Sequence, residues 1–274
     1  MTIPPSSYPM TWEQAVRWLR EQPGSEALVR ACFYDDPLPE SARRFRDSAE
    51  WLAVRALLPA PPGRALDVGA GRGIASYALA ADGWDTTALE PDPSALVGAG
   101  AIDALARDTN LPITIERQMG ERMPFDDDAF DVVHCRQVLH HARDLERFCA
   151  ELFRVLKPGG TFIATREHVV DTDADLAVFL ANHPLHALYG GENAFSLPRY
   201  LSALNGAGFT LTHVLSPWES AINLFPATIE DIRMQLARAW HLPFPRLIPD
   251  WLLRLASRRS RTPGRLYTFV GVKP

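Results

Sequence analysis

The fold is decided by the stretch Ala65-Leu66-Asp67-Val68-Gly69-Ala70-Gly71-Arg72-Gly73-Ile74-Ala75. Its first four residues form an apolar run typical of a buried parallel strand, and residues 74–79 have helical character. Three glycines lie between them, and without Cβ atoms their backbone can approach a ligand closely. Amides at the start of the helix are free to donate hydrogen bonds. The stretch therefore predicts a strand, a ligand-binding glycine loop and a helix.

A carboxylate follows the next expected strand. Thr86–Leu89 is strand-like and ends at Glu90, nineteen residues after Gly71. A carboxylate in this position suits two ribose hydroxyls. The loop reads G-x-G-x-G, whereas dinucleotide-binding loops read G-x-G-x-x-G, so the spacing disfavours a nicotinamide dehydrogenase.

Strand-like and helix-like segments alternate from Ala65 onward. Between the strands we expect helices at about 73–81, 94–107 and 145–156, and another at about 197–206. This alternation predicts an α/β fold whose parallel sheet has helices on both faces and binds ligands at the carboxyl ends of its strands. The expected strands are Ala65–Val68, Thr86–Leu89, Ile113–Arg117, Phe130–Cys135, Thr161–Thr165, Phe209–Leu215 and Leu266–Val272.

Segments outside this repeat are expected to surround the ligand site. Residues 1–60 predict an N-terminal helical cap with one long helix from Ser41 to about Leu58, followed by a main domain over 61–274. Within that domain, residues 171–196 are expected to form a lid, and residues 218–264 a helical insertion with helices near 229–240 and 249–257. The cap residues that could reach the ligand site are Tyr34, Arg44, Glu50 and Trp51.

Composition excludes several classes of function. The 274 residues carry a net charge of −5, so no basic field attracts nucleic acid. No apolar run approaches membrane-spanning length, and the first nine residues do not resemble a signal peptide. The three cysteines are scattered, which fits a reducing compartment. We therefore expect a cytoplasmic protein without a membrane span.

A second group of motifs follows the glycine loop: Met123–Val133, Gln137–His141 and Arg154–Gly160. Together with that loop they resemble the class I S-adenosylmethionine-dependent methyltransferases of small molecules, over about residues 64–167. The resemblance implies a Rossmann-like sheet of seven strands with the last one antiparallel. The segments REHVV (166–170) and HPLHALYGGENAF (183–195) are more weakly similar to bacterial polysaccharide O-methyltransferases, such as those of the mycobacterial methylmannose polysaccharide pathway.

The resemblance assigns S-adenosylmethionine as methyl donor. The family often has an Asp near the adenine, but Met119 and Gly120 occupy the matching positions, so that side-chain contact is missing. The backbone amides there can still donate, and backbone carbonyls at the end of the fourth strand would face the methionine ammonium. The implied donor-binding residues are Asp67, Gly69, Gly71, Gly73, Glu90, Pro91, Gly120, Glu121 and Arg136.

Histidines follow the fourth expected strand, where the methyl group should point. An imidazole, with a pKa of about 6.5, can take a hydroxyl proton at neutral pH. His141 matches the family's more regular histidine and is the expected general base, with His140 as a second candidate; alternatively both only brace the loop. Glu167 and His168 are expected either to bind substrate hydroxyls or to hold Mg²⁺, and Tyr189 to contact the substrate.

These features together predict an O-methyltransferase for a hydroxyl of a small molecule, a sugar or oligosaccharide in particular. Two alternatives stay open within enzymes: an O-methyltransferase for phenolic natural products, and an N- or C-methyltransferase. A third is a non-catalytic subunit that binds S-adenosylmethionine. The sequence does not identify the acceptor, and it leaves the oligomeric state open, a homodimer included.

Overall fold

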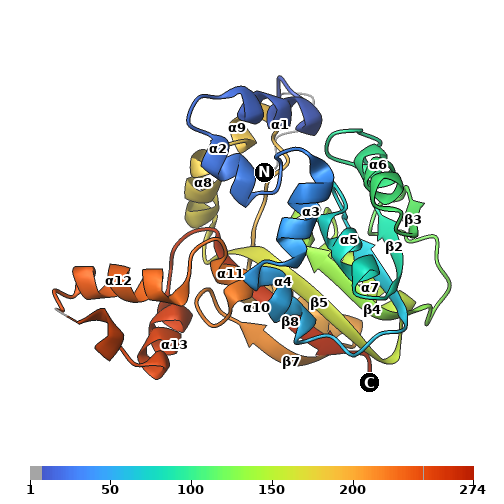
Figure 1. Ribbon diagram of the computed structural model, residues 1–274. Helices are drawn as coiled ribbons and strands as arrows, with labels where there is room; N and C mark the ends of the chain where they lie inside the picture. The colour runs from blue at the N-terminus through green and yellow to red at the C-terminus, as the bar shows by residue number, and fades with distance from the viewer. Residues whose placement is uncertain (1–7, 243) are drawn as a thin grey trace.

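A computed structural model describes residues 8–242 and 244–274 (Figure 1). The first nine residues were compared above with a signal peptide, and residues 1–7 of these lie outside the described residues. The strands are β1 (Arg64–Val68), β2 (Asp85–Leu89), β3 (Ile113–Glu116), β4 (Phe130–Arg136), β5 (Leu156–Val170), β6 (Phe195–Ser196), β7 (Thr210–Leu215) and β8 (Arg265–Val272).

The strands form one sheet in the order β3-β2-β1-β4-β5-β8-β7. Neighbours from β3 to β5 are parallel, and β8 lies antiparallel between β5 and β7. The predicted Rossmann-like α/β class, with its antiparallel last strand, is confirmed. The two-residue β6 pairs with β5 and adds a short strand to the expected seven. β5 is also much longer than the expected Thr161–Thr165.

Two helical segments depart from the prediction. The single helix expected over Ser41–Leu58 is broken in two, because Ser48 leaves the helical conformation and accepts a hydrogen bond from the Trp51 amide at 3.2 Å, which caps a second helix. The expected lid contains two short helices of its own. The helices are α1 (Trp12–Glu21), α2 (Glu26–Ala31), α3 (Leu38–Arg46), α4 (Ala49–Arg55), α5 (Ile74–Ala81), α6 (Ala99–Thr109), α7 (Leu145–Val155), α8 (Asp173–Asn182), α9 (His186–Tyr189), α10 (Leu197–Ala207), α11 (Ala221–Leu224), α12 (Ile229–Ala239) and α13 (Asp250–Arg259), with 3₁₀ turns η2 (Leu139–His141) and η3 (Pro245–Leu247).

Helices cover both faces of the sheet because successive strand residues point to opposite sides. On β4, Val133 packs into a core with Leu152 of α7 and side chains of α10. Its neighbour Val132 packs into a second core with Trp51 of α4 and Leu79 of α5. The cap helices α3 and α4 are therefore part of the second core.

The remaining cap helices and the lid gather at one end of the sheet (Figure 1). Val16 and Leu19 of α1 and Val29 of α2 form a small apolar cluster with Leu185 of the lid and Val97. This end holds the carboxyl termini of the parallel strands. The cap and lid thus cover the edge at which such sheets bind ligands.

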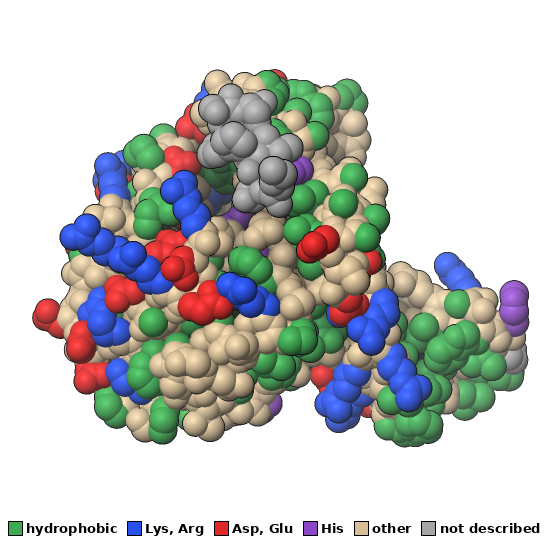
Figure 2. Space-filling view, turned by 180° about the vertical axis from the view of Figure 1, so that it is seen from behind, with side chains coloured by type: hydrophobic (Ala, Val, Ile, Leu, Met, Phe, Trp, Pro, Cys, Tyr) green, Lys and Arg blue, Asp and Glu red, His purple; other side chains and the backbone are tan. Residues whose placement is uncertain are grey.

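The C-terminal insertion projects from the body as an arm made of α12, η3 and α13 (Figure 1). It has its own small core of Ile232, Ala237, Ile248 and Leu253. Hydrophobic side chains also gather on its surface, as Figure 2 shows, and Trp251 is 66% exposed. Among the described residues, no helix combines the length and apolar character that crossing a membrane requires.

A buried ion pair fastens the cap to the sheet. Both carboxylate oxygens of Glu50 on α4 accept hydrogen bonds from the Arg136 guanidinium of β4, at 2.6 and 3.0 Å, and Arg166 lies 3.9 Å away. Glu50 is fully buried. It is therefore engaged behind the ligand site and does not line it, contrary to the expectation. Arg44 and Trp51 are likewise engaged elsewhere, with Asp35 and Asp82 respectively.

We predict that Glu50→Gln lowers the free energy of unfolding by about 3 kcal/mol, because it leaves two buried guanidinium groups without a countercharge. Urea denaturation would measure the change. Glu40→Gln on the exposed side of α3 is the matched control and should change stability by less than about 0.5 kcal/mol. Equal effects of the two substitutions would contradict the prediction.

Candidate active site

A cavity of about 430 Å³ opens at the carboxyl ends of β1, β2 and β4. One wall is the glycine loop and the segment after β2, a second is η2 with the lid, and the third comes from the cap. The lining residues that bear on the argument are Trp12, Tyr34, Asp67, Gly69, Gly71, Glu90, Pro91, Gly120, Glu121, Arg136, His140, His141, His168, His183, Tyr189 and Glu192.

The glycine loop forms the floor of one half of the cavity. Gly69 and Gly71 have φ of +64° and +53°, and a Cβ on Gly69 would lie 2.6 Å from a Val138 methyl carbon. Side chains are therefore disfavoured at Gly69 by both conformation and space. Gly73 differs from the expectation because it does not line the cavity. It precedes α5, with φ of +80°, and a Cβ there would lie 3.1 Å from Ile102, so it serves helix packing.

Glu90 lies where the sequence predicts, at the end of β2 beside the glycine loop. Its two carboxylate oxygens accept hydrogen bonds from the amides of Gly71 (2.7 Å) and Asp92 (2.9 Å). The side chain is mostly buried, and burial raises the pKa of Glu90 to about 7, against the effect of these two hydrogen bonds. Pro91 continues the same wall. A carboxylate that is easily neutralised therefore faces the cavity.

Asp67 also lines the cavity, yet its oxygens are already engaged. One accepts from the Ser76 hydroxyl at 2.6 Å, and the other lies 2.8 Å from His134 Nδ1. His134 was not predicted. Asp67 and His134 are register partners on the parallel strands β1 and β4, so only the sheet pairing reveals the contact.

The segment before β4 forms the other end of the half of the cavity that contains the glycine loop. Glu121 accepts a hydrogen bond from the Arg143 amide at 3.0 Å. Gly120 packs against Phe148 so closely that a Cβ would lie 2.2 Å from the ring. The Arg136 side chain reaches the cavity wall while its guanidinium is held by Glu50. All three residues line the cavity, and their assignment as donor contacts stays a prediction.

Glu167 requires a correction. Its carboxylate accepts hydrogen bonds from the amides of Val138, Leu139 and His140 at 3.0, 3.1 and 3.1 Å, and from His140 Nδ1 at 2.7 Å. It is fully buried and does not line the cavity, so it is unavailable as a substrate or Mg²⁺ ligand. Burial raises the pKa of Glu167, and the backbone hydrogen bonds oppose that rise. Its role is to fix η2 and the His140 ring.

The two histidines of η2 have different surroundings. His140 is buried, and burial lowers its pKa well below the usual range. His141 is exposed toward the cavity, and its Nδ1 lies 2.8 Å from the Gly191 carbonyl oxygen. Because a carbonyl can only accept, Nδ1 of His141 donates and Nε2 keeps its lone pair. In the neutral ring Nε2 therefore carries the lone pair, and none of the described residues forms a hydrogen bond with it.

The lid forms the rest of the half of the cavity that contains η2. The Tyr189 hydroxyl donates to Glu192, and His183 Nε2 lies 3.6 Å from the same carboxylate. Burial opposes ionisation of Glu192, but His141, His140 and His183 outweigh it and lower its pKa to about 2. From β5, His168 donates through Nδ1 to the Gly264 carbonyl at 2.8 Å.

Sequence reasoning identified Tyr189 and His168 as site residues, but it named Glu192 and His183 only as members of the lid. The polar composition of the lid was the available signal. Which of its side chains face the cavity depends on how α8 and α9 pack.

Comparison with known proteins gives the family. Residues 66–164 match the family model described as "Methyltransferase domain". The chain is 36% identical over 199 residues to a protein named uncharacterized methyltransferase from Mycolicibacterium paratuberculosis, which covers 70% of this chain and 68% of that protein. It is 31% identical over 150 residues to a ubiquinone biosynthesis O-methyltransferase from Methylobacterium nodulans, covering 53% and 59%.

A solved structure shares the fold. Geranyl diphosphate C-methyltransferase from Streptomyces coelicolor, determined with Mg²⁺, geranyl diphosphate and S-adenosyl-L-homocysteine, superimposes with a TM-score of 0.61 at 14% identity, covering 97% of this chain and all of that one. Matches to three of the curated methyltransferases span 64%, 41% and 59% of those proteins' lengths. The chain belongs to the class I S-adenosylmethionine-dependent methyltransferase family.

Proposed function

We propose that this protein transfers a methyl group from S-adenosylmethionine to a hydroxyl of a small molecule, with His141 as general base. One observation carries the proposal: His141 lines the same cavity as the glycine loop and Glu90, and its Nε2 has no hydrogen-bond partner among the described residues. A relative named as an O-methyltransferase adds support for oxygen as the acceptor atom.

The donor half fits S-adenosylmethionine in its residue types. Glu90 would accept hydrogen bonds from ribose hydroxyls, and Gly69 and Gly71 leave room above the loop. Pro91 would pack near the adenine, and the amides of Gly120 and Glu121 would donate hydrogen bonds to it. When bound, S-adenosylmethionine supplies an activated methyl carbon on a sulfonium sulfur.

His141 would then take the proton of the acceptor hydroxyl through Nε2. Its Nδ1–H bond to the Gly191 carbonyl fixes the tautomer that leaves Nε2 able to accept. Glu192, placed nearby and ionised, favours the imidazolium that forms. The bond between lid and base also means that His141 is oriented only when the lid is packed.

A saccharide is the acceptor class that this half supports best. Hydrogen-bonding groups for several hydroxyls are offered by His168, His183 and Glu192. The aromatic rings of Trp12 and Tyr189 line the same cavity, and their centroids lie 4.6 Å apart. If the protein methylated only phenols, a saccharide would be excluded as the acceptor, whereas the methyltransferase activity would stand. A non-catalytic donor-binding subunit would form no S-adenosylhomocysteine with any acceptor.

We predict that His141→Ala lowers kcat at least about 100-fold, because an oxygen nucleophile loses its proton acceptor. S-Adenosylhomocysteine release would be measured with a panel of partly methylated oligosaccharides and phenols. Affinity for S-adenosylmethionine should not change.

The matched control is His213→Ala, an exposed histidine on β7 whose ring contacts only Thr212 by hydrogen bond among the described residues. Its kcat should equal that of the wild type. Unchanged turnover in His141→Ala would exclude the general-base role and favour a nitrogen acceptor.

We also predict that affinity for S-adenosylmethionine falls as the pH drops below 7. The pKa of Glu90 is about 7 in the ligand-free chain, and ribose hydroxyls are bound by the ionised form, so protonation competes with binding. The dissociation constant, measured by calorimetry, should rise by up to about tenfold per pH unit below that value.

Glu90→Gln should bind more weakly, with a dissociation constant that no longer changes between about pH 5.5 and 8. A wild-type affinity that is flat over this range would contradict the role of Glu90. So would a variant that retains the full pH dependence.

A further inference from the structure

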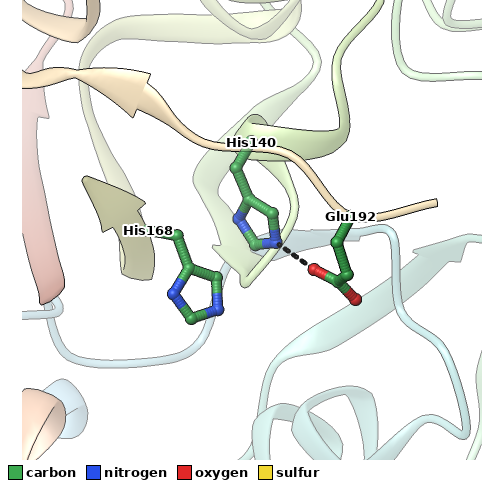
Figure 3. Close-up of side chains that lie close together, drawn as sticks. All are labelled: His140, His168 and Glu192. Atoms are coloured by element: carbon green, nitrogen blue, oxygen red, sulfur yellow. Dashed lines mark ion pairs between the residues drawn. The ribbon is translucent and has the colours of Figure 1, made fainter. Parts of the chain in front are cut away.

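Three side chains of types that bind metals come from separate segments and converge in the half of the cavity that contains η2 and the lid. His140 comes from η2, His168 from β5, and Glu192 from the lid. One ligand atom of each lies within 4.8 Å of those of the other two. Figure 3 shows the three side chains side by side, with the Glu192 carboxylate directed at the His140 ring. Convergence of this kind from three elements is the first requirement of a metal site.

The atoms that face one another are hydrogen-bond acceptors. His140 Nδ1 donates to Glu167, and His168 Nδ1 donates to the Gly264 carbonyl, so Nε2 carries the lone pair in both rings. His140 Nε2 lies 3.7 Å from Glu192 Oε2, which is beyond hydrogen-bond distance. His140 and Glu192 are both largely buried. Buried acceptors facing each other are unfavourable unless a cation or a proton lies between them.

The surroundings of the three residues are those that metal ligands require. The hydrogen bond on the far nitrogen of each histidine fixes the tautomer and orients the ring. For His140 the partner is the Glu167 carboxylate at 2.7 Å, and for His168 a carbonyl at 2.8 Å. Glu192 is in turn oriented by the Tyr189 hydroxyl.

We infer that His140, His168 and Glu192 form a binding site for one divalent transition-metal ion. Two imidazoles and one carboxylate suit Zn²⁺, Co²⁺ or Fe²⁺ better than Mg²⁺, which prefers oxygen ligands. This set differs from the expected pair of Glu167 and His168, because Glu167 only supports His140. With an ion bound, His168 and Glu192 would hold an acceptor hydroxyl through the ion, and His183 would remain for direct hydrogen bonds.

The site itself is inferred from geometry, whereas its role rests on the proposed function. An ion there supplies Lewis acidity toward an oxygen, which would favour loss of the acceptor hydroxyl proton to the neighbouring His141. The rings of His140 and His141 have centroids 4.2 Å apart. The cavity would therefore polarise and deprotonate a hydroxyl from adjacent positions.

The test is direct metal binding by the untagged full chain after dialysis against a chelator. Co²⁺ would be titrated at about pH 7.5, followed by visible absorption and by elemental analysis of the bound metal, with Zn²⁺ and Mg²⁺ as competitors. We expect about one Co²⁺ per chain, displaced by Zn²⁺ and not by Mg²⁺. His140→Ala, His168→Ala and Glu192→Gln should each weaken binding at least about 100-fold, and Glu167→Gln about 10- to 100-fold.

His213→Ala is the control for a histidine outside the site, and S-adenosylhomocysteine binding by each variant checks that the fold and the donor half are intact. Absence of stoichiometric Co²⁺, or equal affinity in the site variants and the control, would overturn the inference and leave a proton between His140 and Glu192. Methyl transfer that continues undiminished after chelation would overturn the assigned role while leaving the proposed function. If the protein bound the metal but transferred no methyl group to any acceptor, the metal site would stand and the proposed function would be contradicted.

Discussion

The carboxylate of Glu167 is the contact on which the site depends most. It accepts four hydrogen bonds, three from consecutive backbone amides of residues 138–140 and one from the His140 ring. A buried carboxylate is costly unless it is fully hydrogen-bonded, and here the turn after β4 supplies the hydrogen bonds. These hydrogen bonds fix the backbone conformation of residues 138–140, and so the position of η2. That turn places Val138 against Gly69 and both histidines at the cavity, so one group links the donor and acceptor halves.

The two halves of the cavity are built differently. The donor half consists of strand ends and the glycine loop, braced by the Asp67–His134 contact between β1 and β4. In the other half, which contains η2 and the lid, residues 185–192 orient His141 and His183. Such a division allows the donor site to be rigid while the acceptor specificity lies in segments that can vary.

The fold and the donor half could be predicted because they are encoded locally. The alternation of strands and helices, the loop glycines and Glu90 are visible within about 25 consecutive residues or as a repeating pattern. That Gly73 packs against Ile102 and does not line the cavity is not visible locally, because Ile102 belongs to another helix. Glu167 lies within β5, which runs well past the expected end at Thr165, and the sequence does not show that the amides after β4 occupy its carboxylate. Glu192 and Glu50 depend on how the lid and the cap pack, which periodicity does not encode.

The central claim is that this cavity delivers a methyl group to oxygen. It is tested most directly by incubating the protein with S-adenosylmethionine labelled with ¹³C in the methyl group and a mixture of saccharide and phenolic acceptors, then recording the carbon spectrum of the products. The chemical shift of the labelled carbon reports the atom to which it is bonded. The account predicts methyl ethers. Label on nitrogen or carbon, or label that stays entirely on the donor, would contradict it.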